Sequence, residues 1–459
     1  MNTQTAGLRS RVSRQSVAPK TLFILIIIVV LIFVIYFLTG LKPVTYYKPN
    51  YVYPHWKKSN LTACRGKVIY DPIIKVTNLK TYMVGSYIEH RQEVKMIRTI
   101  AIVHRSENAE YQCMLCCSGT KVSVSATLNI HSDHFGFDYG TADIICQIPE
   151  ECPTPEHVAI TSKSPKENGS LQYIHAFQPV RNQQKQEVFR YEFTVCISAM
   201  YDYENVLLLV QAMEMYRILG VQKVAIYKTN CSNVTQKVLD YYISQDFVEL
   251  IPWSVSSYIN VSRGWRKWES PGELHYFGQI AALNDCLYRY MYKSHYVALQ
   301  DMDEFILPLN LNSWTELLPE LERKYGQGVG FEFENNLFPI YLKDPKSEYS
   351  PDFWKKVPGQ NILEYVHRLR NDPSQFNDFK VIINPRLVFE TTIHGLLKSM
   401  NGAVRVNPEV ARMYHIRKFK KEGTLTGNPI LDPHLRDYAD RLIPAVSEVL
   451  QKALKLPKV

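Results

Sequence analysis

The feature that most constrains this chain is an uninterrupted apolar run near its N-terminus. Residues 21–38 read TLFILIIIVVLIFVIYFL and include no charged side chain. A helix of this length spans roughly 27 Å, close to the ~30 Å hydrocarbon core of a bilayer. A cleaved signal peptide has a shorter apolar region followed by small residues, whereas TGLKPVTYY follows here. Because the run is long and has no polar break, a transmembrane anchor at 21–39 is favoured over a buried helix of a soluble domain.

Basic residues on one side of this run predict its orientation. Arg9, Arg11, Arg14 and Lys20 precede it, and no acidic residue does. Because Lys and Arg stay on the cytosolic side of a membrane, we expect a cytosolic tail at 1–20 and the chain after Gly40 on the opposite side. This is the layout of a single-pass type II protein held by a signal-anchor.

The rest of the chain suits the lumen of the secretory pathway. Asn-x-Ser/Thr glycosylation triplets occur at Asn60, Asn168, Asn230, Asn233 and Asn260. Asn230 and Asn233 are too close together for both to be assumed modified.

The cysteines point the same way. All nine follow the anchor, where disulfides are permitted. Because the number is odd, at least one is unpaired or bonds another chain. Cys113 and Cys116 have CxxC spacing, but the adjacent Cys117 and β-rich surroundings favour disulfides over a zinc or redox motif.

Composition divides the next part of the chain into three segments. Residues 40–66 are rich in Tyr, Pro, Lys and Asn, which predicts an extended stem. Short β-branched and aromatic runs fill 67–162, bounded by Gly, Asn, Asp and Ser. This pattern predicts a small all-β domain, for which a sandwich is the form we favour. The polar residues at 163–188 predict a linker.

After residue 189 short apolar strands alternate with amphipathic helices, which predicts a mostly parallel sheet with helices on both faces. A single long helix is expected at 272–294. Another helix follows Ser313, whose side chain is placed to cap it together with Glu316. A C-terminal tail at 426–459 contains a further amphipathic pattern near 437–454. Ligands of such sheets bind at the carboxyl ends of the strands.

An acidic pair lies at one such strand end. HYVALQDMDEFILP is expected to be one strand, and alternation along it places Asp301 and Asp303 on the same face. Two carboxylates side by side repel unless a cation lies between them, and oxygen ligands suit Mg²⁺ or Mn²⁺. A solvated surface turn is the simpler alternative. A glycosidase pair is the other, although two acids this close suit metal binding better than attack from opposite sides of a sugar.

With these motifs in place, the chain resembles glycosyltransferase family 92 over roughly 191–420. The resemblance depends on CISAMYDYENVLLLVQAMEMYRILGVQKVAIY, FVELIPW, GQIAALNDCLYRYMYKSHYVALQDMDEFILP, FKVIINPRLVFETTIHG and MYHIRK, in this order. It implies an α/β catalytic domain of the GT-A type at 189–425, in which Asp-x-Asp binds a divalent ion and the donor diphosphate.

The resemblance also implies roles for single residues. Asp301 and Asp303 would bind the metal, and Glu304 would orient the sugar. A late histidine commonly completes the metal site, for which His394 is preferred, while His415 and Arg417 would contact the diphosphate. A structural role remains open for each histidine.

Other residues have less certain roles. The sequence does not choose a general base among Glu332, Glu334 and Glu390, and Glu334 is carried forward with the acidic cluster as catalytic. Lys380 and Arg386 can contact phosphate or simply be solvated. Trp265 and Trp268 can form a sugar lid or pack. Asp285 and Cys286 are interpreted as a structural pair at a helix end, with Cys286 bonded to Cys196 or Cys231.

These expectations define an enzyme: an inverting, Mn²⁺-dependent hexosyltransferase of the Golgi membrane that moves galactose from UDP-galactose to a glycan acceptor. The alternative is a membrane-anchored carbohydrate-binding protein without activity. The net charge is +9 and no dense Lys/Arg block is present, so nucleic acid is not an expected partner.

Overall fold

The computed structural model describes residues 64, 66–162, 176–418 and 428–456. The predicted anchor at 21–39, nearly all of the stem, Asn60 and Asn168 lie outside these residues. Within the described part, no helix combines the length and apolar character needed to cross a membrane.

The first described region is built from strands alone, as predicted, but it is a closed barrel. Its strands run in the order β1-β9-β8-β5-β6-β7-β4-β3-β2, and β9 also pairs with β3. The sandwich prediction is therefore wrong. The strand that closes the barrel, β9, lies inside the segment expected to be a linker. Its backbone pairs with β8 on one side and with β3 on the other, so that the sheet closes on itself. The strands are β1 (Lys67–Val68), β2 (Ile74–Lys75), β3 (Thr81–Glu89), β4 (Met96–His104), β5 (Tyr111–Cys117), β6 (Thr120–Ile130), β7 (Tyr139–Gln147), β8 (His157–Ser162) and β9 (Ala176–Arg181).

Disulfides stabilise both regions of the chain. Three lie in and beside the barrel, joining Cys64 to Cys116, Cys113 to Cys146 and Cys117 to Cys152. In the second region Cys196 bonds Cys286, which selects one of the two pairings left open by the sequence. Cys231 is buried and makes no disulfide.

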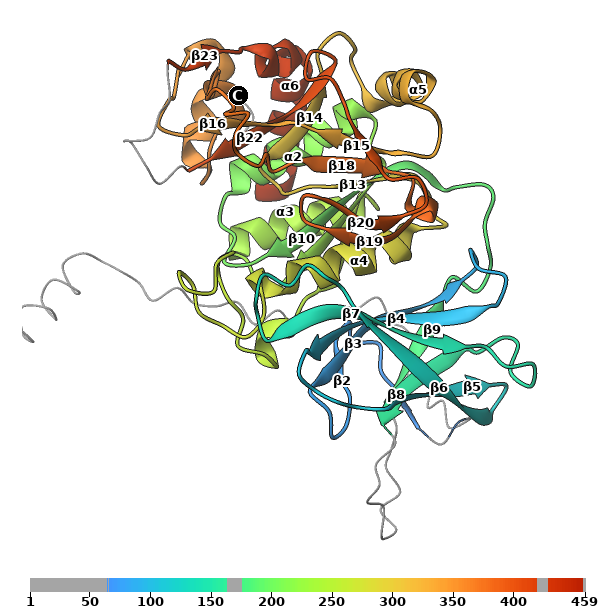
Figure 1. Ribbon diagram of the computed structural model, residues 1–459. Helices are drawn as coiled ribbons and strands as arrows, with labels where there is room; N and C mark the ends of the chain where they lie inside the picture. Colours follow the sequence, from blue (N-terminus) through green and yellow to red (C-terminus); the bar gives the residue numbers. More distant parts are fainter. Residues whose placement is uncertain (1–63, 65, 163–175, 419–427, 457–459) are drawn as a thin grey trace, which may run out of the picture. The chain divides into compact units, whose positions relative to one another are not determined.

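The second region is a mixed α/β domain around a seven-stranded sheet of order β12-β11-β10-β13-β18-β15-β21 (Figure 1). Its first four strands are parallel, as predicted, whereas β18 runs antiparallel to both of its neighbours. A three-stranded sheet, β14-β22-β16, lies beyond it. The elements are β10 (Tyr191–Met200), α2 (Val206–Leu219), β11 (Lys223–Lys228), α3 (Asn233–Ser244), β12 (Val248–Pro252), α4 (Gln279–Tyr290), β13 (Ser294–Leu299), β14 (Glu304–Pro308), α5 (Trp314–Tyr325), β15 (Gly330–Phe333), β16 (Asn335–Pro339), β17 (His367–Arg368), β18 (Lys380–Ile383), β19 (Val388–Thr392), β20 (Gly395–Ser399), β21 (Ala403–Arg405), β22 (Ala411–Arg417), β23 (Ile430–Leu431) and α6 (Ala439–Leu454).

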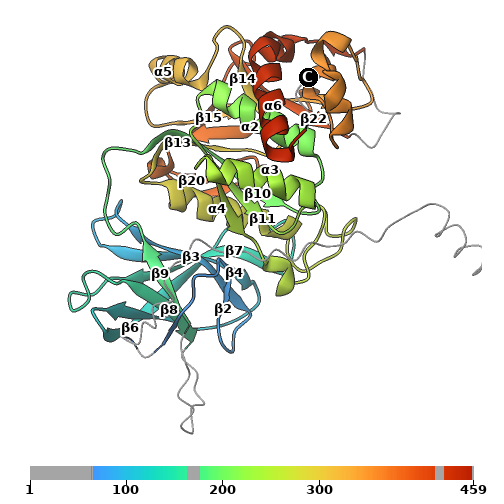
Figure 2. The same ribbon diagram turned by 180° about the vertical axis from the view of Figure 1, so that it is seen from behind.

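The two faces of the large sheet bury different partners because side chains alternate along each strand. Val195 and Ile197 of β10 belong to a core that includes α2, α3, α5 and α6, the helices seen from behind in Figure 2. Cys196 points to the other face, into a core shared by α4 and barrel residues such as Tyr87. Helix α6 contacts α2 and α3, so the expected C-terminal tail is part of the domain core.

Buried polar contacts join α4 to the barrel, whose strands β3, β4 and β7 lie against it (Figure 1). The Asp285 carboxylate accepts hydrogen bonds from Tyr87 at 2.6 Å and from Tyr227 at 2.5 Å, and Arg289 forms an ion pair with it at 2.8 Å. The structural interpretation of Asp285 agrees with this network, although the residue lies within α4 rather than at its end.

Two of the predicted elements are interrupted. The expected helix at 272–294 begins only at Gln279, because Tyr276, Phe277 and Gly278 adopt left-handed φ angles of 29°, 53° and 70°. The expected strand through the acidic pair is two strands in different sheets, separated by a turn at 300–303. Because apolar runs lie on both sides of that turn, the two strands look like one continuous strand in the sequence. Asp301 and Asp303 are therefore not alternating residues of one strand.

Candidate active site

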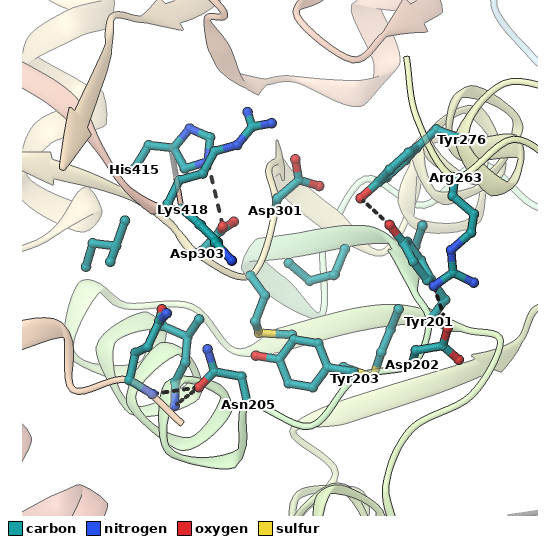
Figure 3. Close-up of a pocket in the computed structure, with 18 of the residues that line it drawn as sticks. Tyr201, Asp202, Tyr203, Asn205, Arg263, Tyr276, Asp301, Asp303, His415 and Lys418 are labelled. Carbon is teal, nitrogen blue, oxygen red and sulfur yellow. Dashed lines mark hydrogen bonds and ion pairs between the residues drawn. The ribbon is translucent and has the colours of Figure 1, made fainter. Parts of the chain in front are cut away.

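The acidic turn opens into a cavity at the carboxyl ends of the parallel strands. The cavity has a volume of about 540 Å³. Residues 199 and 200 end β10 and residues 201–205 follow it, Asp301 and Asp303 follow β13, and residues 415–418 lie at and just after the end of β22. Figure 3 shows these segments surrounding one space. Four residues predicted from the sequence line it together: Asp301, Asp303, His415 and Arg417.

The two aspartates are held by different groups. Asp301 accepts hydrogen bonds from Gln279 at 3.1 Å and from the Lys380 ammonium at 3.0 Å. Asp303 faces the His415 imidazole, whose Nε2 lies 3.7 Å from a carboxylate oxygen. Each side chain remains 32% exposed. Both carboxylates are thus oriented by buried cationic partners while keeping one side open to a ligand.

Lys380 and Glu304 form the floor beneath these aspartates. Lys380 is 2% exposed and its Nζ lies 3.4 Å from the Glu304 carboxylate, which is 1% exposed. Burial and the nearby charge of Asp301 raise the pKa of Glu304 to about 7, although Lys380 opposes this shift. Burial alone would lower the pKa of Lys380, but Asp301 and Glu304 raise it above its usual value. Lys380 therefore supports the acidic turn from below and does not line the cavity.

His415 connects the same two acids from the other side. Its Nδ1 lies 3.5 Å from Glu304 and is buried without a hydrogen bond. Burial opposes protonation, yet the charges of Asp303 and Glu304 raise the pKa of His415. Burial also raises the pKa of Asp303, but His415 outweighs it and the net shift is downward. The pair favours an imidazolium beside an ionised carboxylate.

More cationic groups line the cavity than the sequence indicated. Arg417 and Lys418 follow His415 at its rim, and Arg263 enters from the loop after β12. Arg263 forms an ion pair with Asp202 at 2.6 Å, and Asn230 donates to the same carboxylate at 2.7 Å. Arg263 and Asp202 were missed because they are 61 residues apart, and although Asp202 lies in the block that begins CISAMYD, no local pattern gave either residue a role.

His394 lies behind the cavity wall rather than in the lining. Its ring stacks on Trp265, a lining residue, with centroids 4.8 Å apart. Burial and the Lys380 charge lower the pKa of His394 to about 4, which keeps the ring neutral. Its Nε2 is buried without a hydrogen bond. His394 remains a prediction as a metal ligand.

The three glutamates considered as a base are engaged elsewhere and are not among the lining residues of the described chain. Glu334 accepts a hydrogen bond from Asn371 at 2.7 Å, and Glu332 lies 3.8 Å from Arg405. Glu390 accepts a hydrogen bond from Asn129 of the barrel. The carboxylates of the lining are Asp202, Asp301 and Asp303.

Aromatic side chains cover the rest of the cavity. Tyr201, Tyr203, Trp265 and Tyr276 belong to the lining, and Tyr201 donates to the Tyr276 hydroxyl at 3.0 Å (Figure 3). Trp268 of the same loop as Trp265 is 79% exposed. Arg386, the other proposed phosphate contact, instead donates to backbone carbonyls of Met291, Ser294 and His295.

Among the described glycosylation triplets, Asn233 and Asn260 are exposed. Asn230 is half-buried and its side-chain amide donates to Asp202. Because a glycan is attached through that nitrogen, modification of Asn230 would place a sugar directly at the contact with Asp202 beside the cavity.

The donor set at the acidic turn fits a divalent cation. Two half-open carboxylates offer oxygen ligands, and the imidazole offers a nitrogen ligand once its proton is released, a combination that suits Mn²⁺. Three carboxyl groups gather here around Lys380 and His415, and a metal ion that displaces the imidazole proton would keep the positive charge beside the two aspartates.

Comparisons with known proteins agree with the resemblance. Residues 191–449, more than half of the chain, match the model of Glycosyltransferase family 92. The Glycosyltransferase family 92 protein F13G3.3 of Caenorhabditis elegans is 24% identical over 227 residues, which cover 49% of this chain and 41% of that protein. The Beta-1,4-galactosyltransferase galt-1 of the same organism is 25% identical over 241 residues, covering 50% and 49%. The chain thus spans less than half the length of either relative.

Solved structures were compared as well. The crystal structure of glucosyl-3-phosphoglycerate synthase from Mycobacterium tuberculosis with Mn²⁺, uridine diphosphate and glucosyl-3-phosphoglycerate aligns at a TM-score of 0.23 and 9% identity. The alignment covers 58% of this chain and 81% of that one.

Proposed function

The chain belongs to glycosyltransferase family 92, and we propose on this basis that it transfers galactose from UDP-galactose to a glycan acceptor with inversion at the anomeric carbon. The observation that carries the proposal is the convergence of Asp301, Asp303, His415 and Arg417 on one cavity at the carboxyl ends of the parallel strands. The similarity to a beta-1,4-galactosyltransferase supports galactose as the sugar. A GT-A arrangement of the domain is part of the same proposal.

The cavity has the charges that this reaction requires. In the transfer, the bond between the anomeric carbon and the diphosphate oxygen breaks, an acceptor oxygen bonds that carbon, and the hydroxyl proton leaves to a base. Negative charge grows on the departing diphosphate. Arg417 and Lys418 lie at the rim, where they can bind it, and the buried His415 lines the cavity beside them. Preoriented cations stabilise such charge strongly.

A divalent ion, with Mn²⁺ as the expected metal, would be held by Asp301 and Asp303 and would neutralise diphosphate charge when bound. The protein's own part is to orient those ligands. Lys380 and Gln279 fix the Asp301 carboxylate, and His415 fixes Asp303. Buried supporting contacts of this kind keep ligands in a productive geometry.

The site of action follows from the sequence. The apolar run at 21–39 and the basic tail before it support a single-pass type II anchor, with the described domains in the lumen of the Golgi. The disulfides support a lumenal location, because such bonds persist in oxidising compartments.

Donor turnover tests the proposal. The full chain in detergent is given Mn²⁺, a glycan mixture and a panel of UDP-sugars, and released UDP is measured. We expect release with UDP-galactose, loss of release with EDTA, and loss in the Asp301→Asn, Asp303→Asn double variant. Folded protein that neither binds nor cleaves any donor would contradict the proposal and favour the carbohydrate-binding alternative.

A further inference from the structure

A second group of acid and imidazole side chains lies outside the cavity, where the barrel meets the α/β domain. His131 follows β6, Asp143 lies on β7 and Glu390 lies on β19. One ligand atom from each comes within 4.8 Å of the others, and all three residues are buried. None of them serves the reaction proposed above.

The imidazole of this group lacks the hydrogen bonds that a buried histidine normally makes. Its side chain is 0% exposed, and neither ring nitrogen has a hydrogen-bond partner. The Nε2 atom lies 3.3 Å from an Asp143 oxygen without the alignment of a hydrogen bond. Unpaired polar atoms in a dry interior are costly, so the arrangement indicates a missing partner that accepts lone pairs.

The carboxylates also have free capacity. Arg98 binds one oxygen of Asp143, and the other oxygen, Oδ1, is buried without a partner. Arg98 and Arg91 balance the charges of Asp143 and Glu89. No Lys or Arg of the described residues forms an ion pair with Glu390. One buried negative charge is left uncompensated.

We propose that His131, Asp143 and Glu390 bind a structural divalent cation of the Zn²⁺ class that ties the barrel to the α/β domain. Zinc takes histidine nitrogen and carboxylate oxygen at about 2.0–2.2 Å, which places tetrahedral ligands about 3.4 Å apart. Side-chain adjustments of about an ångström bring the three donors to that spacing. The cation supplies both the missing partner of the imidazole and the missing positive charge.

Neighbouring contacts already orient these ligands. Asn129 donates to Glu390 at 2.9 Å, Arg98 fixes Asp143, and Thr392 donates to Asp133. The end of β6 and the loop after it are thereby aligned with β19. Such outer contacts are typical of metal sites. The β19–β20 hairpin also carries His394, which stacks on the cavity residue Trp265, so the cation stabilises the wall of the active site from behind.

Metal content tests the proposal without reference to activity. The test uses full-length protein with Asp301→Asn and Asp303→Asn, two substitutions that eliminate the candidate catalytic metal site. This protein is loaded with Zn²⁺ and desalted, and its zinc content is measured by mass spectrometry. We expect one Zn²⁺ per chain. A control variant of the same barrel, His157→Ala, should retain this ion. Glu390→Gln should lose it and bind Zn²⁺ at least about 100-fold more weakly than its parent. Glu390→Gln keeps the side-chain volume and the acceptor for Asn129.

Unfolding of the same Asp301→Asn, Asp303→Asn chain gives a second measurement. A strong chelator should lower its melting temperature by several degrees, and Zn²⁺ should restore it, while the chain that also has Glu390→Gln responds to neither. The proposal is overturned if the loaded protein carries no stoichiometric Zn²⁺, if Glu390→Gln binds it as tightly as the parent, or if the chelator leaves the melting temperature of the Asp301→Asn, Asp303→Asn chain unchanged.

Discussion

Two clusters of acids and imidazoles lie in this molecule, one open and one closed. At the cavity, Asp301 and Asp303 keep 32% of their side chains exposed. At the junction, the side chains of His131 and Asp143 are 0% exposed. Catalytic metal sites keep a position open for substrate, whereas structural sites are closed to it. Similar residue types therefore serve different purposes, depending on whether solvent reaches them.

The open cluster should be dispensable for folding and essential for turnover. In the Asp301→Asn, Asp303→Asn variant, UDP release from UDP-galactose should fall by about 1,000-fold, because the charge stabilisation of the leaving diphosphate is lost. The melting temperature should change little, since repulsion between the acids is relieved. A large loss of stability with retained turnover would remove the distinction between the two clusters.

Beneath the open cluster, the buried residues Lys380 and Glu304 should matter for stability, as the closed cluster does. Lys380→Met leaves the buried Glu304 and Asp301 without their cation, which should cost about 3 kcal/mol of unfolding free energy. Denaturant titration measures this cost. Adding Glu304→Gln should recover part of it, because one buried charge is removed. Equal stability of Lys380→Met and wild type would show that water reaches this floor.

A buried histidine between the two clusters should make the stability of the protein depend on pH. His275 is 3% exposed, stacks on Phe135 of the barrel and has no hydrogen bond at either nitrogen. Burial, with the nearby His394, lowers the pKa of His275 to about 3 from the ordinary 6.5. The unfolded chain therefore binds more protons below pH 6.5, and stability falls as pH falls through that range.

This shift predicts that His275 contributes about 1 kcal/mol to the loss of stability between pH 7 and pH 5.5, and that His275→Gln removes this contribution while that of His394 remains. Unfolding free energies of both proteins at the two pH values provide the comparison. Parallel pH profiles would mean that His275 is solvated in solution.

A substitution at the rim of the cavity should have the smallest effect on activity and stability. Trp268 is 79% exposed in the loop that carries Arg263 and Trp265 to the cavity. Trp268→Ala should raise the acceptor KM a few-fold, since sugars stack on aromatic faces, and leave the melting temperature unchanged. Ile243→Ala, another exposed apolar residue, is the matched control. An unaltered KM for every acceptor would exclude the loop from acceptor binding.

Much of the α/β domain was predictable from local patterns. The parallel strands, the capping of α5 by Ser313 and the position of the acidic pair after β13 all follow from periodicity and motif. The break between β13 and β14 did not, because apolar runs on both sides conceal a change of sheet. The barrel closure by β9 was likewise hidden in a polar segment whose backbone, rather than its side chains, makes the contacts.

The sequence by itself determined most strands and helices of the α/β domain, the family and the acids at a strand end, because these depend on neighbours within a few residues. Tertiary structure alone decided which distant side chains share a space. It placed Lys380 under Asp301, 79 residues away, joined Asp202 to Arg263, and brought His131 to Glu390 across the domain junction. Charge pairing and burial act through space, and a linear pattern carries no record of the distances that control them.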